Sequence, residues 1–237
     1  MKVVAALFVG GMAVALVHGQ GSSPPDKQAS SAAEVVFDFE RPGLSVPKFT
    51  LTVREDGTGS YKGEMAAVSA GSAGNGAPRG AGQPINQTVR LSASTAESIF
   101  NTARSLDYFN IACASKAKNI ADTGKKVLSY SGPDGHGSCT YNYSEIKSVT
   151  QLTETFQAIA FTMDEGRKLD FMHRYDRLGL YSEMDVLKRE LEAKRALELV
   201  NISPSLTSIA NDEALMERVR ERAVALLNVA GAPPKQP

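Results

Sequence analysis

The sequence has no tryptophan, only three histidines and two cysteines in 237 residues, and its 26 basic residues balance 26 acidic ones. The balanced charge argues against nucleic acid or an anionic membrane surface as a partner, because proteins that bind either one usually carry an excess of lysine and arginine. The hydrophobic share of 42% is still enough for a folded core. The shortage of histidine and cysteine limits which metal sites and catalytic dyads the chain can form.

Metal, cofactor and nucleophile motifs are missing as well. Zinc generally takes three or four His, Cys or carboxylate ligands, whereas the only compact His/Cys cluster joins His136 to Cys139. The chain has no HExxH motif, no paired CxxC motifs, no P-loop and no GxSxG elbow. The segment GNGAPRG lacks the spacing and the flanking strand and helix of a dinucleotide-binding fingerprint. We therefore predict no metal site, no cofactor and no catalytic residues.

The first 19 residues have the pattern of a signal peptide. Lys2 precedes an apolar run from Val3 to Val17, and Val17 and Gly19 suit the −3 and −1 positions of a cleavage site. The run has about 15 residues, fewer than the roughly 20 of a spanning helix. An uncleaved membrane anchor is the alternative. We predict cleavage before Gln20, no membrane span in the mature chain, and a secreted or periplasmic location.

The two cysteines are Cys113 and Cys139. In an oxidising compartment an even pair indicates a disulfide. Such a bridge would stabilise the folded state by roughly 3–4 kcal/mol in the chain-entropy model. A free reactive thiol is the alternative.

The first half of the mature chain has the pattern of an antiparallel sheet. After a flexible linker at residues 20–33, EVVFDFE and KFTLTVR have strand composition, and Asp56-Gly57 predicts a hairpin into a return strand. A Gly/Ala-rich loop is predicted at residues 66–87, with a further strand in QTVRLSAS. TAESIFNTARSLDYF then predicts a helix, with Ser94 as its N-cap and Glu97 completing a capping box.

A second hairpin is predicted from KKVLSYSG and SCTYNYSE around the turn-rich PDGHG. His136 and Ser138 lie beside Cys139 there, and together they resemble a nucleophile and its base. The glycines of a hairpin tip hold side chains too loosely for catalysis, however, because a catalytic group needs a supporting shell. We predict for His136 an exposed contact at the turn.

Helices follow beyond Ser148. Gly166 marks a point where the first of them breaks or weakens, and Ser182 can cap a second. The segment Asn201–Asn211, which contains Pro204, is predicted as a connection to a last helix. Acidic residues pair with basic ones at i,i+4 spacing, which favours solvated helix faces over a catalytic carboxylate pair. For FMHRYDRLGLY we predict a helix end packed on the sheet, with a partner-binding face as the alternative. The expected inward residues are Leu152, Phe156, Ile159, Met163, Met184, Leu187, Leu191, Leu215, Val219 and Leu226.

This order of elements predicts an α+β fold. A small antiparallel sheet of hairpins with packed helices would cover residues 34–163, and a helical extension would follow over 164–229. Residues 230–237 are predicted as a disordered tail.

Residues 35–163 resemble small bacterial envelope domains in the order FDFERPG, FTLTVREDGTGSY, VRLSASTAESIFNTARSLDYF, second hairpin and LTETFQAIAF. Emfourin-type inhibitors of thermolysin-like metalloproteases are similar in this order. The Gly-rich insertion, the cysteine pair and the helical extension depart from it. The resemblance implies a protein that binds or inhibits a partner, and no inhibitory residue carries over from it.

We therefore predict an exported, non-catalytic protein that binds or inhibits an envelope partner. The alternatives are a carboxylate-dependent hydrolase, which a pocket of titratable side chains would favour, and an assembly protein, which an exposed apolar stripe on the Ser182–Val200 or Asp212–Asn228 helix would favour. Sequons at Asn86 and Asn142 allow N-glycosylation in a eukaryotic secretory pathway.

Overall fold

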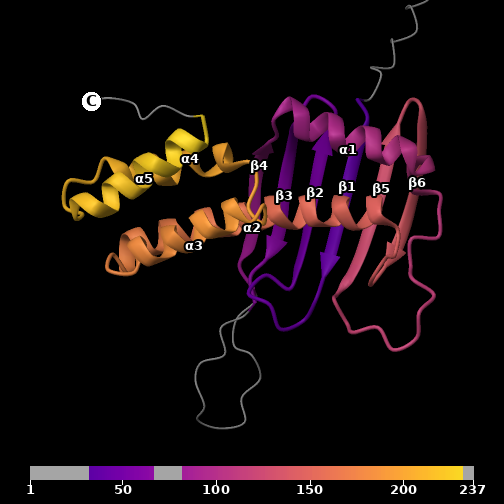
Figure 1. Ribbon diagram of the computed structural model, residues 1–237, viewed down its shortest axis with the longest axis horizontal. Coiled ribbons are helices and arrows are strands. Elements are labelled where there is room, and N and C mark those ends of the chain that lie inside the picture. Colours follow the sequence, from indigo (N-terminus) through magenta and orange to yellow (C-terminus); the bar gives the residue numbers. More distant parts are fainter. Residues whose placement is uncertain (1–31, 67–81, 232–237) are drawn as a thin grey trace, which may run out of the picture. The chain divides into compact units, whose positions relative to one another are not determined.

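A computed structural model describes residues 32–66 and 82–231, which belong to one compact unit. The predicted signal peptide, most of the linker, the middle of the Gly-rich loop and residues 232–237 lie outside the described residues. The fold is α+β, as the sequence predicts: a six-stranded antiparallel sheet with helices packed against it (Figure 1).

The six strands lie in the order β4-β3-β2-β1-β5-β6, and every neighbouring pair is antiparallel. Phe37 is paired with Leu51 on one side and Leu128 on the other, and all three are buried. Because side chains alternate along a strand, this register puts the apolar residues of the strands on one face. The strands are β1 (Glu34–Glu40), β2 (Lys48–Arg54), β3 (Thr58–Glu64), β4 (Pro84–Arg90), β5 (Lys125–Gly132) and β6 (Gly135–Tyr141).

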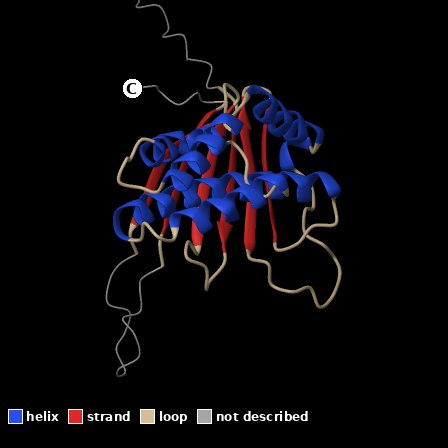
Figure 2. Cartoon of the chain, turned by 60° about the vertical axis from the view of Figure 1, so that its left-hand side comes forward, coloured by secondary structure: helices blue, strands red, loops and turns tan. Residues whose placement is uncertain are grey.

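Helices α1 and α2 pass across the apolar face of the sheet, and Figure 2 shows the helical layer in front of the strands. The contact is direct, since the rings of Phe37 and Phe156 stack with centroids 5.1 Å apart. The helical elements are α1 (Ala93–Ser105), η1 (Asp107–Phe109), α2 (Lys147–Tyr175), α3 (Leu180–Glu192), η2 (Leu199–Ile202), α4 (Ser203–Ala210) and α5 (Glu217–Val229).

Two hydrophobic cores share helix α2. The first lies between the sheet, α1 and the first part of α2, and its last residue is Met163. The second begins at Leu169 and joins the end of α2 to α3, α4 and α5. The boundary predicted between residues 163 and 164 therefore falls within one continuous helix, at the point where the two cores meet.

The predicted Gly-rich loop extends too far, because residues 84–87 belong to β4. Pro84 is the first residue of this edge strand, where the missing N–H of proline is tolerated, and Ile85 is buried. The predicted end of the loop at residue 87 is wrong because Pro84, a residue type typical of loops, begins an edge strand instead.

The connection predicted at Asn201–Asn211 is also wrong, because the segment forms the end of η2 and helix α4. Pro204 lies in the first turn of α4, where a proline removes no helical hydrogen bond. Leu206 and Ile209 are buried in the second core.

Among residues 32–66 and 82–231, no helix combines the length and the apolar composition that a membrane span requires.

Helix α2 continues through Gly166, and the missing side chain of this glycine allows η2 to approach closely. A Cβ atom at Gly166 would lie 2.4 Å from Cγ2 of Ile202. Ile202 is buried in the second core, so its side chain has little room to move. The glycine is thus a packing residue rather than a helix break.

We expect Gly166→Ala to lower the free energy of unfolding by about 1–3 kcal/mol through overpacking, despite the better helix propensity of alanine. Urea denaturation would measure this loss. Combining Gly166→Ala with Ile202→Ala should cost less than the sum of the two single changes, because the second removes the clashing methyl group. Additive effects would contradict the close contact.

Candidate functional site

The hairpin that carries His136 differs from the prediction at its tip. Strands β5 and β6 pair as far as Gly132 and Gly135, so the turn contains only Pro133 and Asp134. His136 is an exposed residue of β6 opposite Ser131. His136 is thus exposed, as predicted, but it belongs to β6 beside the turn rather than to the turn itself, and its contact stays a prediction.

The glycines on either side of His136 pair with β5 as strand residues, and the η1 segment packs directly over them. A Cβ atom at Gly135 would lie 2.6 Å from the ring of Tyr108, and one at Gly137 would lie 2.5 Å from the carbonyl oxygen of Tyr108. Glycine within a strand often marks such a close approach. Asn110 donates from Nδ2 to the carbonyl oxygen of His136 at 2.9 Å, so η1 also covers this edge of β6.

Cys113 and Cys139 form a disulfide with Cα atoms 5.8 Å apart. The bridge ties the irregular segment after η1 to β6, and both cysteines are buried in the first core. The predicted pairing thus matches the structure and has a structural role.

Replacing both cysteines by serine should lower the free energy of unfolding by roughly 3–4 kcal/mol, because the unfolded chain gains loop entropy. Urea denaturation of the oxidised protein and the double variant would measure the difference. The mass of the oxidised protein should fall by two hydrogens relative to the reduced form. Two titratable free thiols in the protein as isolated would contradict the bridge.

His173, the second histidine of the described residues, also has a structural partner. Its Nε2 lies 2.8 Å from Oδ2 of Asp212, which connects α2 to the turn before α5. Asp212 also accepts the backbone N–H of Ala214 at 2.9 Å. The contact with His173, the Ala214 bond and the charge of Arg177 keep the pKa of Asp212 below its usual range.

The segment FMHRYDRLGLY does not pack on the sheet as predicted, since its buried residues Met172 and Leu180 belong to the second core.

A carboxylate pair lies between α2 and α3, formed by the buried Glu165 and the half-buried Glu183. Glu165 on α2 is only 7% exposed, and its Oε2 atom has no hydrogen-bond partner among the described residues. The Nζ atom of Lys168 lies 2.6 Å from Glu183 on α3 but 4.0 Å from Glu165. Burial, reinforced by the neighbouring carboxylate of Glu183, raises the pKa of Glu165 to about 7. Neither Glu165 nor Glu183 lines the groove described below.

The raised pKa of Glu165 means that the folded state disfavours its ionised form. Stability should therefore fall as the pH rises from about 4.5 to about 7. Glu165→Gln should match the wild type near pH 4.5 and exceed it at pH 8 by on the order of 2 kcal/mol. Urea denaturation across this range measures the effect, with the exposed Asp170→Asn as the control. A difference that does not change with pH would contradict the assignment.

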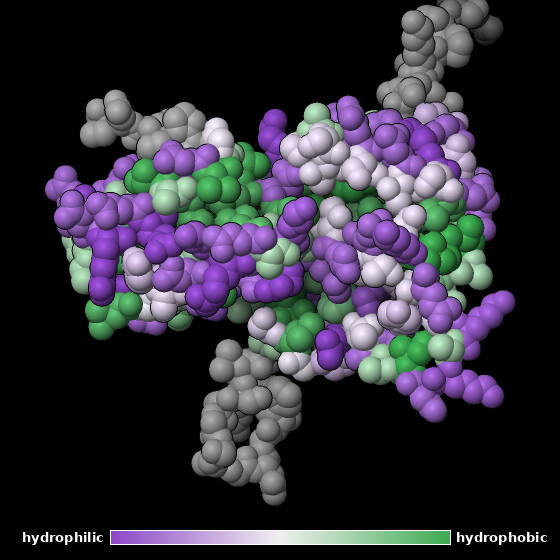
Figure 3. Space-filling view, viewed as in Figure 1, coloured by the Kyte–Doolittle hydropathy of each residue, from purple (hydrophilic) through white to green (hydrophobic). Residues whose placement is uncertain are grey.

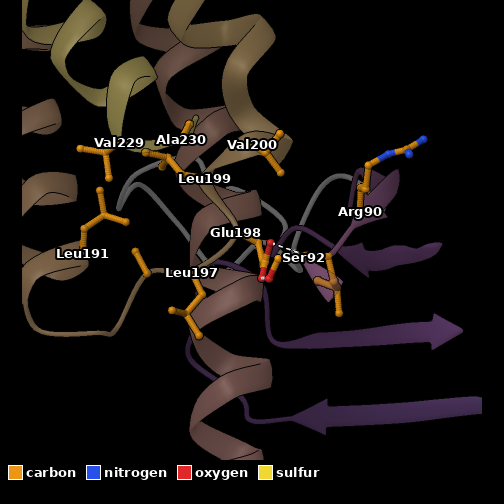
Figure 4. Close-up of a pocket in the computed structure, with 11 residues that line it drawn as sticks. Arg90, Ser92, Leu191, Leu197, Glu198, Leu199, Val200, Val229 and Ala230 are labelled. Atoms are coloured by element: carbon orange, nitrogen blue, oxygen red, sulfur yellow. Dashed lines mark hydrogen bonds between the residues drawn. The ribbon is translucent and has the colours of Figure 1, made fainter. Parts of the chain in front are cut away.

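A groove of about 560 Å³ lies where the end of α3, η2 and the end of α5 meet the start of α1. In Figure 4, Leu191, Val229 and Ala230 lie along one side of this cavity, and Glu198 and Ser92 lie together at another. A second groove of about 330 Å³ shares Leu191 and Val229 and continues between α3 and α5. We call the two together the α3–α5 groove.

The polar end of the groove holds the helical part of the chain against the sheet. Glu198 accepts the backbone N–H of Ser92 at 2.9 Å and its hydroxyl at 2.8 Å. Ser92 is the N-cap of α1, and the predicted cap Ser94 lies inside the helix. Asn201 bonds both backbone groups of Arg90 at the edge of β4. These groups are occupied by structural contacts, so the free surface of the groove is its apolar side.

The apolar side is exposed to solvent. Val229 is 70% exposed and Val200 is 39% exposed, and Figure 3 shows hydrophobic surface over α4 and α5. Arg222, Ala225 and Val229 line the groove from one face of α5. Their i, i+3, i+7 spacing in the sequence already places them on one face of a helix. The apolar pattern predicts that Leu191 points inward, whereas it is only partly buried, and the pattern makes no prediction for Val229.

No protein-family model matches this chain, and no curated protein matches it. Among the described residues, no group of three or more His, Cys, Asp or Glu side chains is placed to hold a metal ion. The geometry of the groove is therefore the main guide to function.

Proposed function

We propose that the chain is an exported, non-catalytic protein that binds an envelope protein through the α3–α5 groove. The observation that carries this proposal is an apolar surface formed by the exposed Val200 and Val229 beside the partly buried Leu191. Burying such a surface against a partner is favourable in proportion to its apolar area.

Export is supported by the signal-peptide pattern at the N-terminus and by the disulfide, which suits an oxidising compartment. The resemblance of residues 35–163 to emfourin-type domains supports a binding or inhibitory role, with a metalloprotease as one partner class. The groove itself lies mainly on α3 and α5, which belong to the part of the chain that departs from those domains.

The groove favours an apolar segment as its occupant. Leu191, Ala225 and Leu226 give it an apolar lining. The charged residues of the lining are Arg222 and the ion pair of Lys188 with Glu192, whose charged atoms are 3.7 Å apart. An amphipathic helix that lays its apolar face into a groove uses this combination of features. Because these charges are already paired within the protein, the groove does not select a strongly acidic or basic partner.

Self-assembly is the second candidate function, because an exposed apolar surface on these helices is also the feature that the assembly alternative requires. The exposed Val229 lies at the end of α5, so two copies could bury their grooves against each other in a symmetric contact. This function predicts a concentration-dependent change in mass for the isolated chain, which analytical ultracentrifugation measures.

We expect Val229→Asp to weaken partner binding at least tenfold, because it places a charge in the apolar contact. The measurement is capture of a partner from envelope extract by immobilised protein, followed by titration of the captured partner. Leu44→Asp, at an exposed apolar residue of the β1–β2 loop, is the matched control. Equal capture by both variants would place the binding surface elsewhere, and loss of self-association in Val229→Asp alone would favour assembly.

A further inference from the structure

A separate cavity, of about 290 Å³, lies beside the first turns of α2 and the ends of β5 and β6. Its lining differs from that of the α3–α5 groove, because each of its residues carries a polar group. Volumes near 300 Å³ are at the lower end of small-molecule sites. The proposed function makes no use of this cavity.

Lys126 brings a buried cation to this cavity. The residue is only 4% exposed. Its Nζ atom donates to the carbonyl oxygens of Thr123, Gly124 and Asn142 at 3.0, 3.1 and 2.8 Å, and it lies 2.9 Å from the hydroxyl of Thr123. All four acceptors are neutral, so they satisfy the hydrogen bonds of the ammonium group without cancelling its charge.

Arg41 adds a second positive charge at the mouth of the cavity, where it is exposed to solvent. Burial, and then repulsion from Arg41, lowers the pKa of Lys126, while Asp122 acts in the opposite direction. Glu154, an exposed residue of α2, is the acidic member of the lining. Two cations therefore face one carboxylate in a partly enclosed space.

Among the described residues, two hydroxyl groups of the lining, those of Ser144 and the exposed Tyr143, donate to no protein acceptor. Thr153 donates to the carbonyl oxygen of Val149 at 2.7 Å, so the hydroxyl of Tyr141 donates to Thr153 at 2.5 Å. The hydroxyl oxygen of Ser144 accepts the backbone N–H of Ile146 at 3.2 Å. Its hydrogen therefore remains available to a ligand.

We propose that this cavity binds a small oxyanion group, a carboxylate or a phosphate, through the guanidinium group of Arg41 and the hydroxyl of Ser144. A guanidinium group matches the geometry of both anions with two parallel hydrogen bonds. Lys126 acts through its charge rather than by contact, since its protons are already donated to protein oxygens. The anion is either a free phosphate or the carboxylate at the end of a peptide chain.

Calorimetric titration distinguishes these sources. The probes are inorganic phosphate, acetyl-Ala-Ala with a free C-terminus, and the same peptide as its C-terminal amide. We expect saturable binding of phosphate or of the free acid and none of the amide. Binding of phosphate alone identifies a free anion as the ligand, binding of the free acid identifies a chain end, and no saturable binding of either overturns the proposal.

Variants then test which residues bind. Arg41→Gln should weaken binding at least tenfold and Ser144→Ala to a smaller extent, whereas Arg54→Gln, at an exposed arginine of β2, should leave the affinity unchanged. Lys126→Met should also weaken binding where it folds. Because Arg41 is exposed, Arg41→Gln should fold, and its affinity tests the proposal even if Lys126→Met does not fold. Equal affinities for Arg41→Gln and Arg54→Gln would overturn the proposal.

Discussion

The packing of helix α2 against two cores is the constraint on which the rest of the structure depends. Phe156 stacks on Phe37 of the sheet, and three turns later Gly166 packs against Ile202 of the helical part. Tyr61 also reaches from β3 to Asp164 on this helix, at 2.9 Å. Because one rigid helix takes part in both cores, the sheet and the C-terminal helices are joined by packing as well as by the chain.

The candidate sites follow from this arrangement. The second part of α2 organises α3, η2, α4 and α5, and the α3–α5 groove lies where these helices meet the first turn of α1. The polar cavity lies at the other end of α2, beside Thr150 and Thr153. The Glu165–Glu183 pair lies between them at the α2–α3 contact. The two cavities also differ in chemistry, one apolar and one cationic, so they suit different ligands.

Much of the fold was predictable from short-range patterns. The strands EVVFDFE and KFTLTVR and the Asp56-Gly57 turn were predicted because alternation and turn chemistry depend on neighbouring residues. The errors arose where a distant contact changed the meaning of a local signal. Gly135 and Gly137 resembled a turn, yet they pair with β5 as strand residues, and their missing side chains leave room for η1. Ser94 resembled a cap, but Glu198, more than a hundred residues away in sequence, holds Ser92 in that position.

The sequence by itself determined the α+β class, the helix and strand composition and the identity of the cysteine pair, since only two cysteines were present to form it. Only the tertiary structure decided which polar groups are buried together and which apolar groups stay exposed. Lys126 and Arg41 are 85 positions apart in sequence, and Leu191 and Val229 come from different helices. Their proximity depends on how the sheet and α2 pack, because burial and charge are properties of the whole fold rather than of any segment.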